Sequence, residues 1–207
     1  MGTRYDADDT GRGASRHRRR VVVVAVVVGV LVAVGCAPVK LDSTYVGDAR
    51  SKAFTKAPEP WTVIDVQEQP ALSVRGFWAP GGSQKNLLSA GVVPSGVVVR
   101  RMPTSEDELD LDVLSRQVVF VELESALEQG FASLLEGPTD RRLSSLDGEQ
   151  IVYDLVLPNG TIKVMQLTVA DVRQNEVYGV VVGCNTACFD SNRTTIERIV
   201  GNFRIDK

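Results

Sequence analysis

Residues 150–169 read QIVYDLVLPNGTIKVMQLTV, two β-favouring runs joined by Pro158-Asn159-Gly160. An Asn-Gly pair between two such runs is a strong signal for a β-hairpin, because both residues tolerate the positive φ angles of a tight turn. The sequence therefore predicts two antiparallel strands, over residues 150–157 and 161–169.

Strands are also predicted on both sides of this hairpin. Arg142–Leu146 precedes it and Val177–Gly183 follows it, with turns at Asp147-Gly148 and Arg173–Glu176. Successive hairpins of this kind form an antiparallel meander. Three earlier runs also have strand composition: Trp61–Val66, Ser73–Trp78 and Val97–Met102.

Helical spacing appears twice. A central helix is expected from about Leu111 to Glu136, introduced by Ser105 as a capping residue and ended by Gly137-Pro138. A C-terminal helix is expected to begin at the capping box Thr194–Glu197. Its apolar face would consist of Ile196, Ile199, Val200 and Phe203. Strands in runs with helices between and after them predict an α+β fold, an antiparallel β-sheet with a central and a C-terminal helix.

The N-terminal segment has the organisation of a secretory signal. Arg18-Arg19-Arg20 is followed by an apolar run over residues 21–34, which is shorter than the ~20 residues that a bilayer-spanning helix needs. The end of the run, Ala33-Val34-Gly35-Cys36, resembles the lipobox of bacterial lipoproteins. This resemblance implies cleavage before Cys36 and attachment of acyl chains such as palmitate to Cys36. The alternatives are an ordinary signal peptide with a chance cysteine, or an uncleaved anchor.

The expected organisation is therefore a signal peptide over 1–35, a lipidated Cys36 with a flexible tether over 36–60, and one domain over 61–207. An irregular first strand around Leu41–Val46 is the alternative to a fully flexible tether. Residues 1–35 contain six arginines and three aspartates, so their removal takes the formal charge from −3 to −6. A net-negative chain argues against nucleic acid as a partner, and the acyl chains would attach the protein to the outer face of the cell membrane.

Cys184 and Cys188 lie where the last predicted strand gives way to the C-terminal helix. A disulfide is expected in an extracytoplasmic compartment. Free thiols and a redox pair remain alternatives, although redox pairs usually have Cys-x-x-Cys spacing. Two cysteines alone do not supply the four ligands of a usual zinc site.

Residues 180–205, VVVGCNTACFDSNRTTIERIVGNFRI, carry a family resemblance. This strand, cysteine pair, helix and terminal Phe resemble the end of actinobacterial LpqN/LpqT-type lipoproteins, which are similar to the PsbP-like α/β fold. The resemblance covers residues 58–206, with Pro60-Trp61 in place of the usual Gly-Trp pair. It implies a binding or accessory role and carries over no active site.

The sequence offers few of the residues that common catalytic mechanisms require. His17, the only histidine, lies in the predicted signal, so the processed chain has no histidine for a catalytic triad or a metal site. Nucleophile-elbow, P-loop and dinucleotide-binding motifs are absent from the sequence. A pair of carboxylates, as in glycosidases, is the remaining option. We therefore expect no enzymatic activity, no catalytic or metal-binding residues and no cofactor.

Two features are candidates for binding. Phe77-Trp78, beside Pro80-Gly81-Gly82, is a candidate binding surface, with core packing as the alternative. An acidic run is a candidate cation site, but its spacing does not match an EF-hand and a solvated helix start fits better. The run consists of Glu106, Asp107, Glu108, Asp110 and Asp112.

The expected function is that of a membrane-anchored extracytoplasmic lipoprotein, a binding or accessory module at the cell envelope. Its partner would be an envelope protein or a small ligand. A carboxylate-based wall-glycan hydrolase and a structural assembly subunit of a membrane complex are the alternatives.

Overall fold

The computed structural model describes residues 45–47, 53–103, 117–118 and 121–206, all within one compact unit of the chain, Val34–Lys207. The predicted signal, Cys36, Ser105 and the acidic run lie outside the described residues. The elements in chain order are β1 (Tyr45–Gly47), β2 (Ala53–Lys56), β3 (Thr62–Gln69), β4 (Leu72–Trp78), the 3₁₀ helix η1 (Gln84–Asn86), β5 (Ser95–Arg101), β6 (Gln117–Val118), β7 (Val121–Glu122), α3 (Leu123–Glu128), β8 (Ala132–Leu143), β9 (Leu146–Leu157), β10 (Gly160–Asp171), β11 (Glu176–Asn185), α4 (Thr186–Gly201) and β12 (Arg204–Ile205).

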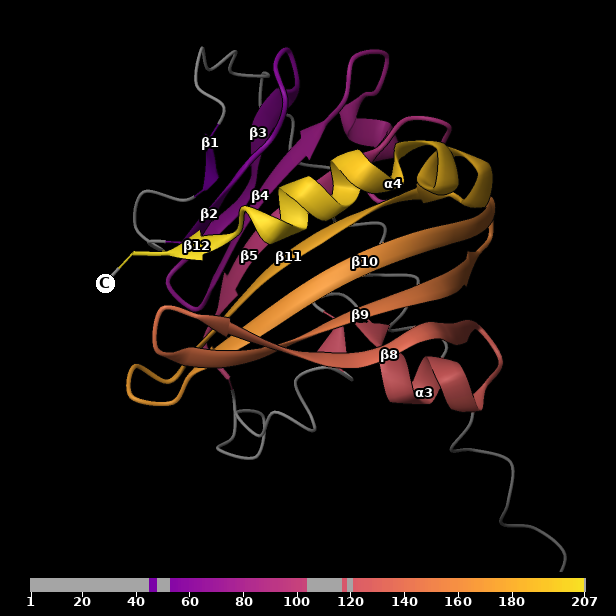
Figure 1. Ribbon diagram of the computed structural model, residues 1–207. Helices are drawn as coiled ribbons and strands as arrows, with labels where there is room; N and C mark the ends of the chain where they lie inside the picture. The colour runs from indigo at the N-terminus through magenta and orange to yellow at the C-terminus, as the bar shows by residue number, and fades with distance from the viewer. Residues whose placement is uncertain (1–44, 48–52, 104–116, 119–120, 207) are drawn as a thin grey trace, which may run out of the picture. The chain divides into compact units, whose positions relative to one another are not determined.

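The main sheet has seven antiparallel strands in the order β3-β4-β5-β11-β10-β9-β8 (Figure 1). The predicted hairpin joins β9 to β10, with Leu157 opposite Gly160. Gly160 has φ +126°, a conformation that side-chain-bearing residues rarely adopt. The Pro158-Asn159-Gly160 prediction is thus confirmed.

The turn between β10 and β11 also lies where the sequence predicts it. Asp171 pairs with Glu176, and Oδ1 of Asp171 accepts hydrogen bonds from the backbone N–H groups of Arg173 and Gln174, at 3.1 and 3.2 Å. Asn175 adopts φ +54°, which asparagine tolerates better than most residues. Local side-chain chemistry therefore suffices to define this turn.

The turn predicted at Asp147-Gly148 is wrong. Asp147 and Gly148 are already paired in β9, opposite Arg142 and Arg141. The chain reverses one pair earlier, between Leu143 and Leu146, and Ser144 adopts φ +59° there. Two neighbouring short polar segments compete for this turn, and the pairing of the strands selects the first.

The predicted central helix is not confirmed as such. Within the described residues of that range the helix α3 covers only Leu123–Glu128, and Gly130, with φ +73°, follows it. Phe131, Leu134 and Leu135, which stand at helical spacing in the sequence, are 53 %, 45 % and 45 % exposed. Their helical spacing was therefore coincidental, and Ala132–Leu143 instead pairs along β9 as the strand β8.

Gly137-Pro138, expected to end the helix, lies within β8. The register of β8 against β9 is interrupted between Leu134 and Glu136 and again between Glu136 and Thr139. Proline lacks a backbone N–H and is tolerated at bulges and on edge strands. Because β8 is the edge strand of the sheet, this position accepts Pro138 without loss of an interior ladder bond.

The C-terminal helix α4 is confirmed, but it begins eight residues before the predicted capping box. Asn185 is its N-cap, and Asn185 Oδ1 accepts a hydrogen bond of 2.8 Å from the backbone N–H of Cys188. Asn is among the preferred N-cap residues. The predicted apolar face is correct, because Ile196, Ile199 and Val200 are fully buried.

A second, three-stranded sheet has the order β1-β2-β12. The flexible tether expected over residues 36–60 is therefore wrong for Tyr45–Gly47 and Ala53–Lys56, where Val46, Ala53 and Thr55 are fully buried. Thr55 Oγ1 also donates a hydrogen bond to the carbonyl of Ile199 in α4. Burial of small and β-branched side chains thus draws the end of the expected tether into the fold.

The core on one face of the main sheet lies beneath α4, which crosses the sheet over β10 and β11 (Figure 1). Its largest buried side chains include Phe77, Met165, Tyr178, Phe189 and Phe203. The outer strands β9 and β8 extend beyond the helix. This uncovered part of the same face forms the groove described below.

Candidate functional site

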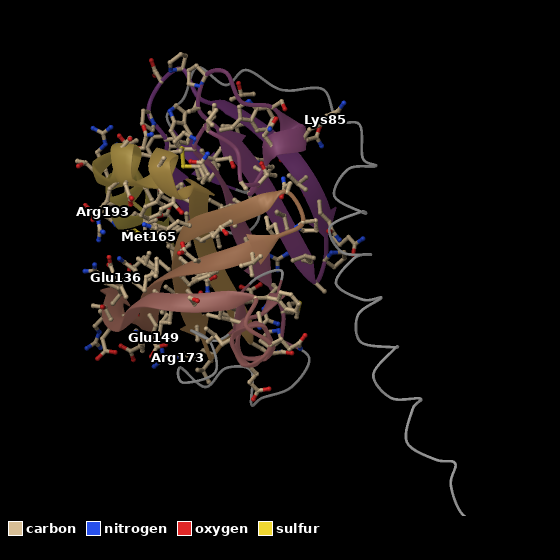
Figure 2. All side chains as sticks on the ribbon, turned by 90° about the vertical axis from the view of Figure 1, so that its right-hand side faces the viewer. Lys85, Glu136, Glu149, Met165, Arg173 and Arg193 are labelled. Atoms are coloured by element: carbon tan, nitrogen blue, oxygen red, sulfur yellow. A yellow bond between two sulfur atoms is a disulfide. The ribbon has the colours of Figure 1, made fainter. Side chains whose placement is uncertain are left out.

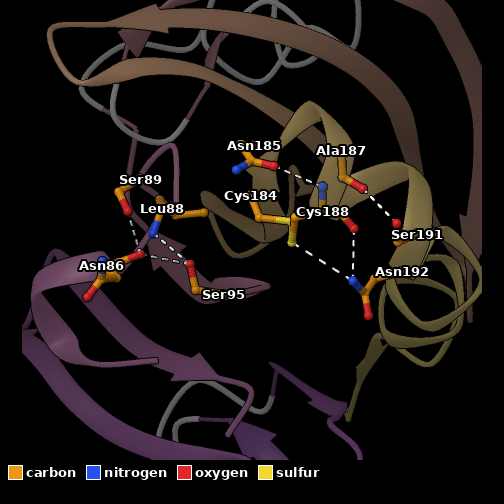
Figure 3. Close-up of a disulfide and its surroundings, with 10 residues drawn as sticks. All are labelled: Asn86, Leu88, Ser89, Ser95, Cys184, Asn185, Ala187, Cys188, Ser191 and Asn192. Carbon is orange, nitrogen blue, oxygen red and sulfur yellow. Dashed lines mark hydrogen bonds between the residues drawn. A yellow bond between two sulfur atoms is a disulfide. The ribbon is translucent and has the colours of Figure 1, made fainter. Parts of the chain in front are cut away.

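The cysteine pair forms a disulfide at the start of α4 (Figure 3). Cys184 lies in β11 and Cys188 in the first turn of α4, with Cα atoms 5.8 Å apart. Asn192 Nδ2 donates to the carbonyl of Cys188 at 2.8 Å, and the backbone N–H of Asn185 donates to the carbonyl of Gly91 at 2.9 Å. The disulfide therefore joins the central strand to the helix within a hydrogen-bonded network.

Phe77 and Trp78 do not form an exposed binding surface. Phe77 is 0 % exposed and Trp78 is 7 % exposed. The Phe77 ring lies 5.9 Å from that of Trp61, and a Cβ atom on Gly96 would come within 2.6 Å of the Phe77 ring. The alternative, core packing, is correct, and Gly96 provides the space that the aromatic ring fills.

A groove of about 530 Å³ opens beside α4, where the outer strands of the main sheet are uncovered. Figure 2 labels two residues that line the groove, Glu136 and Met165, and Arg193, which pairs with Glu136; all three lie on one side of the molecule. The buried side chains of Leu143, Met165 and Leu167 form part of its lining. Its polar lining comes from β8, β9, α4 and the start of β12.

One side of the groove is a three-residue ion-pair network. Arg193 Nη2 lies 2.6 Å from Glu136 Oε1, and Arg193 Nε lies 2.8 Å from Glu197 Oε1. These hydrogen bonds, to Glu197 first and Glu136 second, raise the pKa of Arg193. The two carboxylates are a pair of the kind that glycosidases use, but both are engaged by one guanidinium rather than aimed at a substrate.

The other arginines of the groove have different partners. Arg141 Nε donates to Gln150 Oε1 at 3.1 Å, and Arg204 Nη1 donates to the carbonyls of Gly201 and Phe203 at 3.0 and 2.6 Å. Within the described part of the chain, neither guanidinium forms an ion pair. Both guanidinium groups are therefore oriented by neutral oxygens.

Arg142 is paired more loosely. Its Nε lies 3.8 Å from Asp147 Oδ1, and both side chains are largely exposed. Ion pairs of this kind contribute little, about 0–1 kcal/mol, because water screens them. The groove thus has an acidic side, where the two carboxylates of Glu136 and Glu197 share one guanidinium, and a side on which arginine charge exceeds carboxylate charge.

A second group of charges lies at the other end of the same sheet face. Lys163 Nζ is 2.9 Å from Asp190 Oδ1, and Lys163 is opposite Asp154 across the β9–β10 ladder. Oδ1 of Asp154 is buried and has no hydrogen-bond partner among the residues that the structure describes. Burial raises the pKa of Asp154, the negative charge of Asp190 raises it further, and Lys163 acts in the opposite direction.

The described residues contain no group of three or more His, Cys, Asp or Glu side chains that could hold a metal ion. None of the helices that the structure describes has the length and apolar character needed to cross a bilayer.

The sequence did not identify the groove. Its polar residues, Glu136, Arg141 and Glu197 among them, lie far apart in the chain and match no motif. The one local signal is the pair Arg141-Arg142 in a chain of net-negative charge. That pair alone does not indicate that Arg204, more than 60 residues later, lines the same groove.

Comparison with known proteins gives the fold. No protein-family model matches the sequence, and no curated protein matches it significantly. Among solved structures, the chain is similar to the cyanobacterial PsbP protein, CyanoP, from Synechocystis sp. PCC 6803, with a TM-score of 0.54 and 14 % identity over 84 % of this chain and 99 % of CyanoP. The domain therefore has a PsbP-like fold.

Two further structures are similar at lower TM-scores. LpqN of Mycobacterium tuberculosis, described as involved in cell envelope biogenesis, is 12 % identical over 83 % of this chain and 90 % of LpqN, with a TM-score of 0.47. PA94 of Pseudomonas aeruginosa, a protein of unknown function described as a putative regulator, is 16 % identical over 73 % of this chain and 88 % of its own, with a TM-score of 0.45.

Proposed function

We propose that this protein is a lipid-anchored, extracytoplasmic binding module that acts without catalysing a reaction. In this proposal Cys36 carries the acyl chains, and the PsbP-like domain binds an envelope protein or a small ligand. The groove beside α4 is the binding site.

The disulfide is the main observation that supports an extracytoplasmic location. Disulfides persist in oxidising environments and are rare in the cytosol. Cys184 and Cys188 are both buried in the structure, which suits a structural role better than a catalytic one. Together with the lipobox-like segment ending at Cys36, this bond favours a position outside the cytoplasmic membrane.

The groove favours binding over hydrolysis. A glycosidase needs one carboxyl group to donate a proton and another to attack or to activate water. In the groove, Arg193 bonds to Oε1 of both Glu136 and Glu197, so that one oxygen of each carboxylate is engaged by the same guanidinium. The geometry suits the recognition of a ligand better than the cleavage of a glycan.

An assembly subunit is the second candidate. Phe131, Leu135 and Val156 are each about half exposed, and Val156 donates its backbone N–H to the carbonyl of Phe131. Exposed apolar side chains that gather on a surface can mark a protein-binding region. This candidate predicts cross-links from the start of β8, whereas ligand binding in the groove does not.

The compartment is tested by expressing the full chain in a bacterial host that processes lipoproteins. We expect intact-mass measurement to find a chain that starts at Cys36 and carries acyl groups. Cys36→Ala should remove the acyl mass and the partition into detergent. A chain that keeps Met1 and carries no acyl group would contradict the proposal.

The double variant Cys184→Ala, Cys188→Ala is the matched control, since it also removes cysteines but leaves the predicted lipidation site. It should keep the acyl mass. Cross-linking of the wild type in intact envelopes, with the cross-linker placed once beside the groove and once at Phe131, then separates the two candidates. A partner captured only from Phe131 would favour the assembly subunit.

A further inference from the structure

We infer that the groove beside α4 binds a phosphate monoester, through the guanidinium groups of Arg141 and Arg204. This inference deepens the proposed function by giving its binding site a ligand class. It rests on three features of the groove: charges without carboxylate partners, guanidinium groups that are already oriented, and a suitable volume.

The first argument concerns charge. Two of the arginines in and beside the groove have carboxylate partners. Arg193 is shared by Glu136 and Glu197, and Arg142 has Asp147 nearby. Arg141 and Arg204 are the two lining arginines without an ion pair among the residues that the structure describes. Two uncompensated positive charges match a phosphate monoester, which carries about −1.5 to −2 at neutral pH, better than a carboxylate.

Orientation is the second argument. Arg141 is held through Nε by the Gln150 side chain, and Gln150 is itself within 3.7 Å of the sulfur of Met165 in the groove lining. Arg204 is held through Nη1 by two backbone carbonyls. Each guanidinium keeps further N–H groups for a ligand, and a group that is already oriented loses less entropy on binding. Arginine suits phosphate because its N–H groups form a planar fork.

Size and surroundings are the third argument. The groove volume of about 530 Å³ lies in the range of small-ligand sites, roughly 300–1,000 Å³. Leu143, Met165 and Phe203 contribute apolar atoms to the lining. A phosphate group at the two arginines therefore leaves room for an organic part, either a small polar group or the start of an acyl-bearing glycerol.

The test uses the purified full chain in non-ionic detergent and isothermal titration calorimetry. Glycerol 3-phosphate and dihexanoyl phosphatidic acid are the probes, because both are phosphate monoesters of glycerol and only the second carries acyl chains. We expect both to bind, and Arg141→Gln and Arg204→Gln each to weaken binding by about tenfold, the size of a lost charge-assisted hydrogen bond.

Arg173→Gln is the matched control, since it removes the same charge from the exposed turn between β10 and β11, outside the groove lining (Figure 2). It should leave the affinity within about twofold, as for surface charges screened by salt. Arg141→Lys keeps the charge and should restore part of the binding lost in Arg141→Gln. Thermal unfolding of every variant checks that the fold is retained.

The outcomes are distinct. Tighter binding of the phosphatidic acid identifies a lipid headgroup as the source of the phosphate, and equal binding identifies a soluble phosphate ester. Absence of binding by both probes, or equal weakening by Arg173→Gln, would overturn the inference. Neither result would affect the acylation at Cys36, so failure here is separate from failure of the proposed compartment.

Discussion

Strands β11 and β8 belong to the same sheet but have opposite surroundings. Eight of the ten residues of β11 are buried, whereas ten of the twelve residues of β8 are exposed. The central strand is covered by α4 and joined to it by the disulfide, whereas the edge strand lies outside the part of the sheet that α4 covers and meets the helix through the Arg193–Glu136 ion pair. The covered region provides stability, and the uncovered region leaves polar groups free to bind.

The largest loss of stability is expected from a substitution in the region that α4 covers. Phe189→Ala removes a fully buried ring from beneath α4, which should lower the free energy of unfolding by about 3–5 kcal/mol, as for other buried Phe→Ala changes. Chemical denaturation measures the loss. Phe131→Ala, at a half-exposed ring before β8, should change it by only about 0.5 kcal/mol. Equal losses would show that the two regions contribute alike.

An intermediate loss of stability is expected when the disulfide between β11 and α4 is removed. The double variant Cys184→Ala, Cys188→Ala opens a short loop, for which loop-closure entropy gives a loss of about 2 kcal/mol. Denaturant titration of the wild type with and without reductant should reproduce most of this loss. Reductant should not alter the stability of the double variant. An unchanged midpoint on reduction of the wild type would contradict this contribution.

The smallest effect concerns Asp154, on the uncovered part of the sheet face. Its raised pKa means that the folded state binds more protons than the unfolded state, so the Asp154 contribution to stability falls as pH rises from the ordinary value near 3.8 through the raised value. Asp154→Asn should therefore become more stable relative to the wild type over this window and stay so up to pH 7.

Denaturation of both chains between pH 3 and pH 7 measures this difference. Asp147→Asn removes an exposed carboxyl from the same strand and controls for the change in net charge. A wild type that gains stability over Asp154→Asn as pH rises would show that attraction to Lys163 outweighs burial.

Local signals explain which parts of the fold were predictable. The β9–β10 and β10–β11 hairpins, the register of apolar residues in α4 and the position of the cysteine pair each depend on residues close in sequence. The helix predicted up to Glu136 failed because Phe131, Leu134 and Leu135 have helical spacing without a buried face to fill. Pairing with β9 outweighs that spacing, and only the folded chain reveals the pairing.

The candidate site was the least predictable part. Phe77-Trp78 carried the visible aromatic signal and is core, while the groove arginines matched no motif. Arg141 comes from the edge strand and Arg204 from the chain after α4, so their common groove depends on how far the helix extends over the sheet.

The sequence by itself determined the β9–β10 and β10–β11 hairpins and the C-terminal helix, because turn chemistry and helical spacing act over short distances. The tertiary structure decided that Ala132–Leu143 is an edge strand and that Tyr45–Gly47 and Ala53–Lys56 join the fold. It also decided which arginines remain without carboxylate partners, since burial and ion pairing depend on residues brought together from distant parts of the chain.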